Sequence, residues 1–178
     1  MVDKPPTRLR SKPLARPFEI ALLEPEIPPN TGNVARICAA TGCPLHLIGP
    51  LGFRIDDHAV RRAGLDYWEL VELHQHRTFE EAARNLSLRA PEARCYFFSG
   101  HARRSYLDVA YRPGDVLVFG RESTGLPREL LERHREQVVG IPLLGPVRSL
   151  NVANAVSIAL YEALRQIGAL AGAELRGE

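Results

Sequence analysis

Polar side chains that could bind a ligand gather in three short segments of the sequence. The first, EPEIPPNTGNVAR, holds Asn30 and Arg36 directly after an apolar run. The second, RESTGLP, follows another apolar run and places Glu122 between two glycines. The third, PLLGPVRSLNVANA, brings Ser149 and Asn151 to the start of a long stretch with helical spacing. Amides, a carboxylate, a hydroxyl and a guanidinium are together suited to a polar ligand.

Each segment also has a purely structural explanation. Residues 30–33 can cap a helix that carries an exposed arginine, and Ser149 or Asn151 can cap the long helix. Glu122 can lie in a solvent-facing turn. Capping and binding are compatible, because a helix start presents free N–H groups to a ligand. The local sequence leaves both explanations open for each segment.

The elements that position these segments alternate between strands and helices. Short apolar runs predict strands at residues 18–23, 45–48, 94–99, 115–120 and 138–141. Helical spacing and cap residues predict helices at residues 34–41, 56–63, 78–86, 127–134 and 151–167. This alternation predicts an α/β fold, a single domain with a mostly parallel sheet and helices on both faces. Ligands of such sheets bind at the carboxyl ends of the strands, where the three polar segments begin.

Composition excludes several classes of protein. The 178 residues are 45% apolar and 25% charged, as in an ordinary globular domain. No apolar run is long enough for a membrane helix, and the basic N-terminus lacks the apolar segment of a secretory signal. Three cysteines without a C-x-x-C pair argue against disulfides and zinc. We therefore expect a cytoplasmic protein without a metal site.

Charge is distributed unevenly along the chain. Residues 1–17 hold five basic side chains and one acidic, a net charge of +4, which leaves −2 for the rest. Prolines and charges without periodicity predict a disordered, basic tail over 1–17, followed by one domain over 18–178. A role for the tail in contacting RNA and a passive role both fit the sequence. Any contact of the domain itself with nucleic acid must use a local patch.

The three segments, in this order at these sheet positions, resemble the motifs of the SPOUT (trefoil-knot) RNA methyltransferases. Within that superfamily, EPEIPPNTGNVARICAATG, RRAGLDYW, VFGRESTGLP and IPLLGPVRSLNVANAVSIALYEALRQ look most like the tRNA (cytidine/uridine-2'-O)-methyltransferase family. The resemblance covers residues 18–168. It implies 2'-O-methylation of the wobble (position 34) cytidine or uridine in the tRNA anticodon stem-loop. The methyl donor is S-adenosylmethionine, and S-adenosylhomocysteine is the product.

Two alternatives remain beside that implied function. One is a 2'-O-methyltransferase that acts at another tRNA or rRNA ribose, and the other is a non-catalytic RNA-binding module of the same fold. The resemblance further implies a deep trefoil knot in the C-terminal part of the chain, which forms the cofactor pocket, and a homodimer with the site near its interface. It implies no metal.

Site residues carry over from the resemblance position by position. The implied catalytic set is Asn30, Arg36, Glu122, Ser149 and Asn151. The implied cofactor-binding set is Phe98, Gly120, Ile141 and Ser149, and the implied RNA-binding set is Arg61, Arg62, Tyr67 and Arg121. Relatives often have Pro-Glu-Thr-Arg where this chain has Arg-Glu-Ser-Thr, so the basic residue has moved from the fourth position to the first. We expect Arg36 to act as a cation that stabilises a developing alkoxide, because arginine is not deprotonated in proteins.

Overall fold

A parallel sheet of six strands forms the centre of the molecule. The computed structural model describes residues 7–53, 68–89 and 92–177. The strand order is β4-β3-β2-β6-β5-β7, and every neighbouring pair is parallel. The bounds are β2 (Glu19–Leu23), β3 (Leu45–Ile48), β4 (Leu73–His76), β5 (Cys95–Phe98), β6 (Val116–Phe119) and β7 (Val138–Val139).

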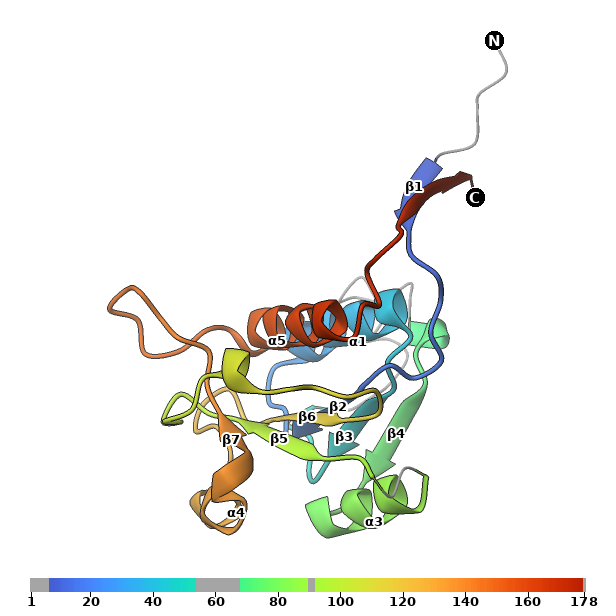
Figure 1. Cartoon of the computed structure of the whole chain (residues 1–178). Coiled ribbons are helices and arrows are strands. Elements are labelled where there is room, and N and C mark those ends of the chain that lie inside the picture. Colours follow the sequence, from blue (N-terminus) through green and yellow to red (C-terminus); the bar gives the residue numbers. More distant parts are fainter. Residues whose placement is uncertain (1–6, 54–67, 90–91, 178) are drawn as a thin grey trace.

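Helices cover both faces of this sheet (Figure 1). α1 (Pro28–Thr41) and α5 (Val152–Gln166) pack on one face, and α3 (Phe79–Arg89) and α4 (Arg128–Arg133) pack on the other. All five residues of β2 are buried: Ile20 and Leu22 join the core under α1 and α5, whereas Ala21 and Leu23 join the core under α3 and α4. The predicted α/β architecture is confirmed. Short 3-10 turns complete the described structure at η1 (Trp68–Leu70), η2 (Tyr106–Asp108) and η3 (Arg135–Gln137).

The long helix α5 is amphipathic, as its spacing predicts. Its buried residues lie along one side and are Ala153, Val156, Ala159, Leu160, Ala163 and Leu164. Its opposite side leaves Ile158 and Tyr161 39% and 44% exposed. These two side chains form part of the outer surface of the helical layer.

The start of α1 differs from the prediction. The helix begins at Pro28 rather than after Asn33, because the two prolines occupy its first turn, where their fixed φ suits a helix and no N–H is needed. Asn30 is therefore a buried residue inside the helix, not a cap. The predicted end is confirmed: Gly42 adopts a left-handed φ of 71° and its N–H bonds to the Cys38 carbonyl.

Two further segments depart from the predicted pattern, and one lies outside the described residues. The helix predicted at 56–63 and the RNA-binding candidates Arg61, Arg62 and Tyr67 lie outside the described residues. The sequence does not predict strand β4, because its residues LHQH are largely polar. The strand is defined by its parallel pairing with β3. Part of the tail predicted to be disordered is a strand: β1 (Thr7–Arg10) pairs antiparallel with β8 (Glu174–Gly177). Pairing between segments so far apart leaves no local pattern.

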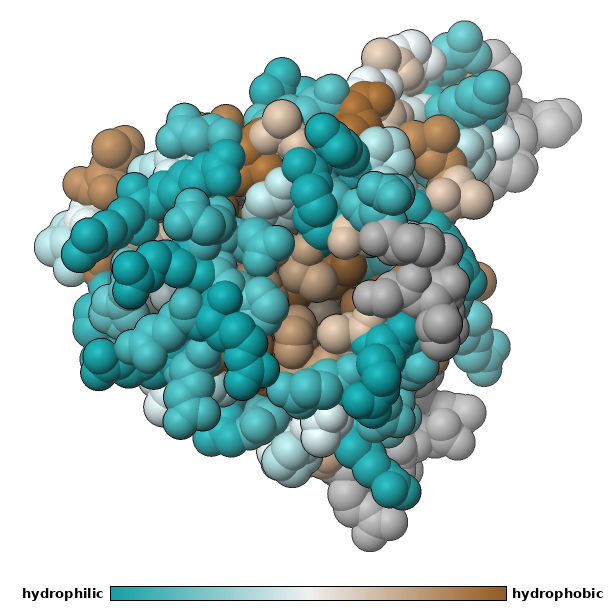
Figure 2. All heavy atoms as spheres, turned by 60° about the horizontal axis from the view of Figure 1, so that its bottom comes forward, coloured by the Kyte–Doolittle hydropathy of each residue, from teal (hydrophilic) through white to brown (hydrophobic). Residues whose placement is uncertain are grey.

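On the side of α3 and α4 the surface is mostly polar and surrounds a hollow with an apolar floor (Figure 2). Within the described part of the chain, no helix is long and apolar enough to cross a membrane.

Candidate active site

The site is built around a tight turn after β6. The N–H of Arg121 donates to the Gly125 carbonyl at 3.2 Å, and the N–H of Gly125 donates to the Arg121 carbonyl at 2.9 Å. Gly125 has a φ of 73°, which favours glycine. A Cβ on Gly120 would lie 2.2 Å from the Gly125 carbonyl carbon. Glycine at both positions lets the turn close and project Glu122 toward the neighbouring strand end.

The Glu122 carboxylate is a triple acceptor. Oε2 accepts from the backbone N–H of Glu26 at 2.8 Å, and Oε1 accepts from the backbone N–H of Ile27 at 3.2 Å. Oε1 also accepts from the Asn30 side-chain amide at 3.0 Å. Ile27 precedes α1 and has no side chain that could cap it. Glu122 therefore supplies, from a distant loop, an anionic acceptor at the positive end of α1.

Asn30 extends this network to the third loop. Its Oδ1 accepts from the Asn151 side-chain amide at 2.9 Å. The Oδ1 of Asn151 in turn accepts from the N–H groups of Ala153 and Asn154, so Asn151 caps α5. An ionised carboxylate only accepts hydrogen bonds, so these contacts fix the orientation of both amides. The three polar segments of the sequence meet through the chain Glu122–Asn30–Asn151.

A second pair of residues closes the same two loops from the other side. The Glu26 carboxylate accepts from the backbone N–H of Ser123 at 3.0 Å and from its hydroxyl at 2.9 Å. Glu26 and Glu122 thus each bind the backbone of the loop that carries the other. Neither Glu26 nor Ser123 is among the site residues that the sequence predicts. Only their positions inside EPEIP and RESTG could have drawn attention to them.

Arg121 forms an ion pair with Glu24 at the end of β2. Glu24 has a φ of 50°, and its side chain lies over Gly49, where a Cβ would come within 2.6 Å of the Glu24 Cγ. The guanidinium that the resemblance assigns to RNA is therefore held in place by a carboxylate, and the Arg121 side chain stays 44% exposed.

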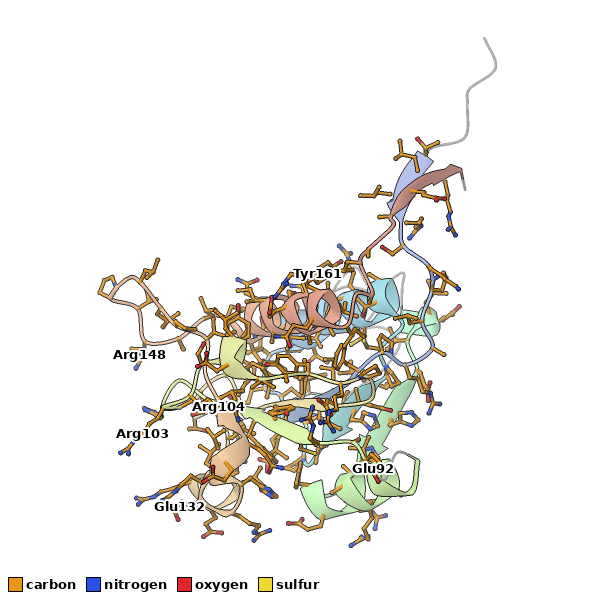
Figure 3. All side chains as sticks on the ribbon, viewed as in Figure 1. Glu92, Arg103, Arg104, Glu132, Arg148 and Tyr161 are labelled. Atoms are coloured by element: carbon orange, nitrogen blue, oxygen red, sulfur yellow. The ribbon has the colours of Figure 1, made fainter. Side chains whose placement is uncertain are left out.

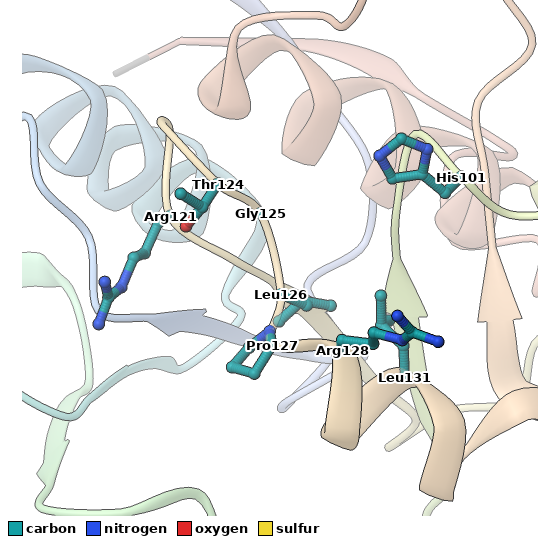
Figure 4. Close-up of a pocket in the computed structure, with 8 residues that line it drawn as sticks. All are labelled: His101, Arg121, Thr124, Gly125, Leu126, Pro127, Arg128 and Leu131. Carbon is teal, nitrogen blue, oxygen red and sulfur yellow. The ribbon is translucent and has the colours of Figure 1, made fainter.

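A hollow of about 610 Å³ opens beside this turn. Basic groups come from His101, Arg121 and Arg128, and an apolar wall comes from Leu126, Pro127 and Leu131 (Figure 4). Gly125 and the hydroxyl-bearing Thr124 complete the lining. The volume and the mixed lining fit a ligand of nucleotide size.

The candidate cofactor residues lie at three adjacent strand ends. Phe98 ends β5, Gly120 follows β6, and Ile141 lies two residues beyond β7, in the sheet order β6-β5-β7. Phe98 is 7% exposed and stacks on Phe119 at 4.6 Å between ring centroids. Ser149 belongs to the exposed segment 142–149 that precedes α5, and the carbonyl of its neighbour Arg148 approaches Gly100, two residues beyond Phe98.

Arg36 occupies another side of α1. It follows Asn30 by six residues, which is about 240° around the axis at 3.6 residues per turn. Its side chain is exposed. The structure therefore brings the side chains of Asn30, Glu122 and Asn151 into contact. Arg36 and Ser149 are exposed at the surface instead.

The three cysteine thiols are not poised to act as nucleophiles. Burial raises the pKa of all three thiols, to about 11 for Cys95, so these thiols stay protonated and unreactive. Over the residues that the structure describes, no group of three His, Cys, Asp or Glu side chains is placed to hold a metal ion.

Proteins of known name are similar to this chain over most of its length. A protein of Burkholderia ambifaria named tRNA (cytidine(34)-2'-O)-methyltransferase is 48% identical over 158 residues, which are 88% of this chain and 99% of that protein. A protein of the same name from Saccharophagus degradans is 48% identical over 85% of this chain and 96% of its own length.

Solved structures also match this chain in fold. One that concerns "the 2-OH methylation of C/U34 on tRNA" has a TM-score of 0.78 and 48% identity, over 84% of this chain and 95% of that one. An rRNA methyltransferase from Sinorhizobium meliloti with AdoMet bound has a TM-score of 0.73 and 27% identity, over 89% of this chain and 62% of that one. The model of the SpoU rRNA Methylase family matches residues 17–161. With the three motif loops joined as described, the chain belongs to the SpoU rRNA Methylase family.

Proposed function

We propose that this protein transfers a methyl group from S-adenosylmethionine to the 2'-hydroxyl of the wobble cytidine or uridine of tRNA. The observation that carries the proposal is the hydrogen-bonded chain Glu122–Asn30–Asn151, which joins three strand-end loops into one polar site. Relatives named for methylation of cytidine 34 share 48% of their aligned residues with this chain.

The strand ends beside that chain fit S-adenosylmethionine. Phe98 and Ile141 offer apolar contacts for an adenine ring, and Gly120 offers only backbone groups, at the end of β6. Ser149 can contribute a hydroxyl from the exposed segment before α5. When bound, the cofactor supplies an electrophilic methyl group on a sulfonium.

The reaction exchanges one bond for another. The 2'-O–H proton would pass to solvent water, the 2'-oxygen would form a bond to the methyl carbon, and sulfur would keep the electron pair of the broken bond to leave S-adenosylhomocysteine. Arg36 stabilises the alkoxide as it develops, since a guanidinium stays charged and donates in a fixed fork. Glu122, Asn30 and Asn151 hold the loops around the reacting groups, so that the geometry is set before the substrate binds.

Recognition of tRNA uses local basic groups, because the domain as a whole is close to neutral. Arg103 and Arg148 point outward from the loops that follow β5 and β7 (Figure 3), and Arg121 lines the hollow beside Glu122. Arg61, Arg62 and Tyr67 belong to this proposal through the resemblance alone. Such contacts suit the phosphates and splayed bases of an anticodon loop.

The knot and the homodimer are part of the same proposal. In support of the knot, the loop after β5 wraps against β7: the N–H of Gly140 donates to the Arg104 carbonyl at 2.9 Å, and the N–H of Tyr106 donates to the Gly140 carbonyl at 3.0 Å. In support of the homodimer, Ile158 and Tyr161 leave apolar surface exposed on α5; Tyr161 is labelled on that helix in Figure 3. The free thiols of this chain fit a reducing cytoplasm, where tRNA is modified.

Methyl transfer from labelled S-adenosylmethionine to total tRNA tests the proposal. The tRNA comes from a strain that lacks this activity, and the labelled nucleoside is then mapped. We expect label on the 2'-oxygen of nucleotide 34. Label on another ribose would keep the chemistry and overturn the substrate. The absence of transfer, together with no calorimetric binding of the cofactor, would identify an RNA-binding module instead.

A further inference from the structure

A salt bridge joins the ends of β2 and β6 beside the hollow. Arg121 follows β6 by two residues, and its Nη2 contacts Oε2 of Glu24, which follows β2 directly. The Glu24 side chain is only 22% exposed. Arg121 also lines the hollow, at one side of it and apart from His101 and Arg128 (Figure 4). The salt bridge therefore lies where a nucleotide bound in the hollow would meet it.

The backbone of Glu24 adopts a conformation that its residue type disfavours. Its φ is 50°, in the left-handed region that glycine, asparagine and aspartate populate more readily than glutamate does. In the part of the chain that the structure describes, Arg16 is the only other non-glycine residue with a positive φ. Asparagine or glycine would make this turn with less strain. Strain of this kind gathers at functional sites, so the Glu24 carboxylate is a candidate for a functional role.

Both ends of the salt bridge are anchored to fixed backbone. The N–H of Glu24 donates to the Ile48 carbonyl at 2.7 Å. The Glu24 side chain lies over Gly49, where a Cβ would come within 2.6 Å of the Glu24 Cγ. The absence of a side chain at Gly49 thus leaves room for the carboxylate. Arg121 is fixed by the two backbone hydrogen bonds that it exchanges with Gly125.

The two loops do not need this salt bridge to stay joined. Glu122 accepts from the backbone N–H groups of Glu26 and Ile27. Glu26 in turn accepts from the backbone N–H and the hydroxyl of Ser123. A partly exposed ion pair adds little stability to such a network. What the salt bridge adds is an orientation of the guanidinium: Glu24 contacts Nη2, and the donors on Nε and Nη1 remain for a ligand.

We propose that Glu24 is a positioning residue for tRNA binding, which orients Arg121 so that its guanidinium binds a phosphate of the anticodon loop. The inference rests on the proposed function, because tRNA is the ligand that supplies the phosphate. A guanidinium binds phosphate through a fixed fork of N–H donors, so its orientation decides whether two hydrogen bonds form or one. The carboxylate also lowers the local positive charge, which acts in the opposite direction. Because the salt bridge is anchored at both ends, Arg121 loses little side-chain entropy on binding, and this favours orientation over charge.

A double-variant cycle on the full-length protein tests this role. The ligand is a tRNA transcript with cytidine at position 34, and the proteins are the unchanged chain, Glu24→Gln, Arg121→Gln and the double variant. We expect Glu24→Gln to raise the Kd for tRNA about 3–10-fold when Arg121 is present and to have no effect when it is absent, as for coupled residues in contact. In steady-state kinetics the KM for tRNA should rise, while kcat at saturating tRNA and the affinity for S-adenosylmethionine stay unchanged.

Two further variants separate orientation from folding. Glu24→Asn relieves the backbone, since asparagine tolerates a positive φ, but its shorter, neutral side chain cannot pair with Arg121. It should bind tRNA as weakly as Glu24→Gln does, yet unfold at no lower urea concentration than the unchanged protein. Glu80→Gln is the matched control, because it removes an exposed ion pair with Arg133 between α3 and α4. Its affinity for tRNA should equal that of the unchanged protein.

Three results would overturn the inference. Unchanged or tighter tRNA binding by Glu24→Gln would show that the carboxylate does not orient Arg121. An equal loss with and without Arg121 would show that Glu24 acts on the loop as a whole. Recovery of affinity in Glu24→Asn would show that only the backbone matters. Methyl transfer by the unchanged protein is mapped in parallel, since label on another ribose would overturn the proposed nucleotide while the binding cycle still decides the role of Glu24.

Discussion

Asn30 and Asn151 lie 121 positions apart in the sequence and share a hydrogen bond of 2.9 Å between their side-chain amides. Asn151 also caps α5, and Asn30 also donates to Glu122. A single pair of amides therefore couples the start of α5 to the turn after β6. Displacement of one loop must disturb the hydrogen bonds of the other two.

Glu122→Gln tests whether the carboxylate holds the loops together. An amide has one oxygen and presents an NH₂ group to donors, so it cannot accept all three hydrogen bonds that Glu122 accepts. We expect a loss of about 1–3 kcal/mol in the free energy of unfolding, together with reduced methyl transfer. Urea unfolding and initial rates measure the two effects. Glu129→Gln, at an exposed position on α4, is the matched control, and equal behaviour of the two variants would contradict the assignment.

Arg36 is predicted to act on the reaction rather than on the cofactor. Arg36→Ala and Arg36→Lys should both abolish turnover, because neither offers a guanidinium to the developing alkoxide. Calorimetry should show S-adenosylmethionine affinity close to that of the unchanged protein. The control is Arg84→Ala, at an exposed position on α3 on the other face of the sheet. Loss of cofactor binding in Arg36→Ala would remove Arg36 from the proposed role.

The sequence predicts the layers of the fold well, because apolar runs and helical spacing record burial directly. The strand ends that carry Glu122 and Asn151 follow from that prediction, and so does their meeting at one edge of the sheet. The contacts themselves do not follow from it. Asn30 reads equally well as a cap, and only the three-dimensional position of Glu122 shows that an acceptor from another loop serves α1.

Strands that are stabilised by pairing with distant segments are not predicted by local sequence patterns. β4 reads as polar because two of its four residues are histidines, and His76 is buried beside His46 of β3. β1 is part of a proline-rich tail by composition and a strand by pairing with β8. In both cases the deciding interaction joins residues that no window of sequence contains.

Acid should weaken the anchor between α5 and the segment before β6. Glu162 accepts from Arg165 at 2.8 Å and from Gln166 at 2.9 Å, and Gln166 accepts from the backbone N–H of Tyr111. These hydrogen bonds, those from Arg165 first, lower the pKa of Glu162 to about 2. Because the folded-state pKa is depressed, the stabilisation is present above the unfolded pKa of about 4.3 and is lost as pH falls toward 2.

The corresponding measurement is urea unfolding between pH 5 and pH 2. The unchanged protein should lose more stability over this window than Glu162→Gln, whose side chain does not titrate. The two curves should converge at the acid end. Parallel curves over the whole window would show that the ion pair of Glu162 contributes nothing to folding.

A chain of polar side chains lies under α3 and joins Glu19 to Asn85 through two histidines. The His46 ring lies 2.5 Å from the Glu19 carboxylate through Nε2 and 2.9 Å from His76 through Nδ1. His76 Nδ1 lies 3.4 Å from the Asn85 side-chain nitrogen. Both histidines satisfy these contacts when neutral: Asn85 donates to His76, His76 donates to His46, and His46 donates to an ionised Glu19.

Removal of His46 alone should therefore cost more than removal of His46 together with Glu19. His46→Leu leaves the Glu19 carboxylate, 5% exposed, without its donor, and we expect a loss of about 3–5 kcal/mol in unfolding free energy. Glu19→Met/His46→Leu replaces both groups with apolar side chains of similar size, so it should lose less than the single variant does. His74 stacks on His46 at 4.8 Å between ring centroids but is bonded to Glu72 near the surface. His74→Leu should therefore cost no more than about 1 kcal/mol in unfolding free energy. Urea unfolding of all three variants separates a cost due to the unpaired carboxylate from one due to lost packing, because only the former is relieved in the double variant.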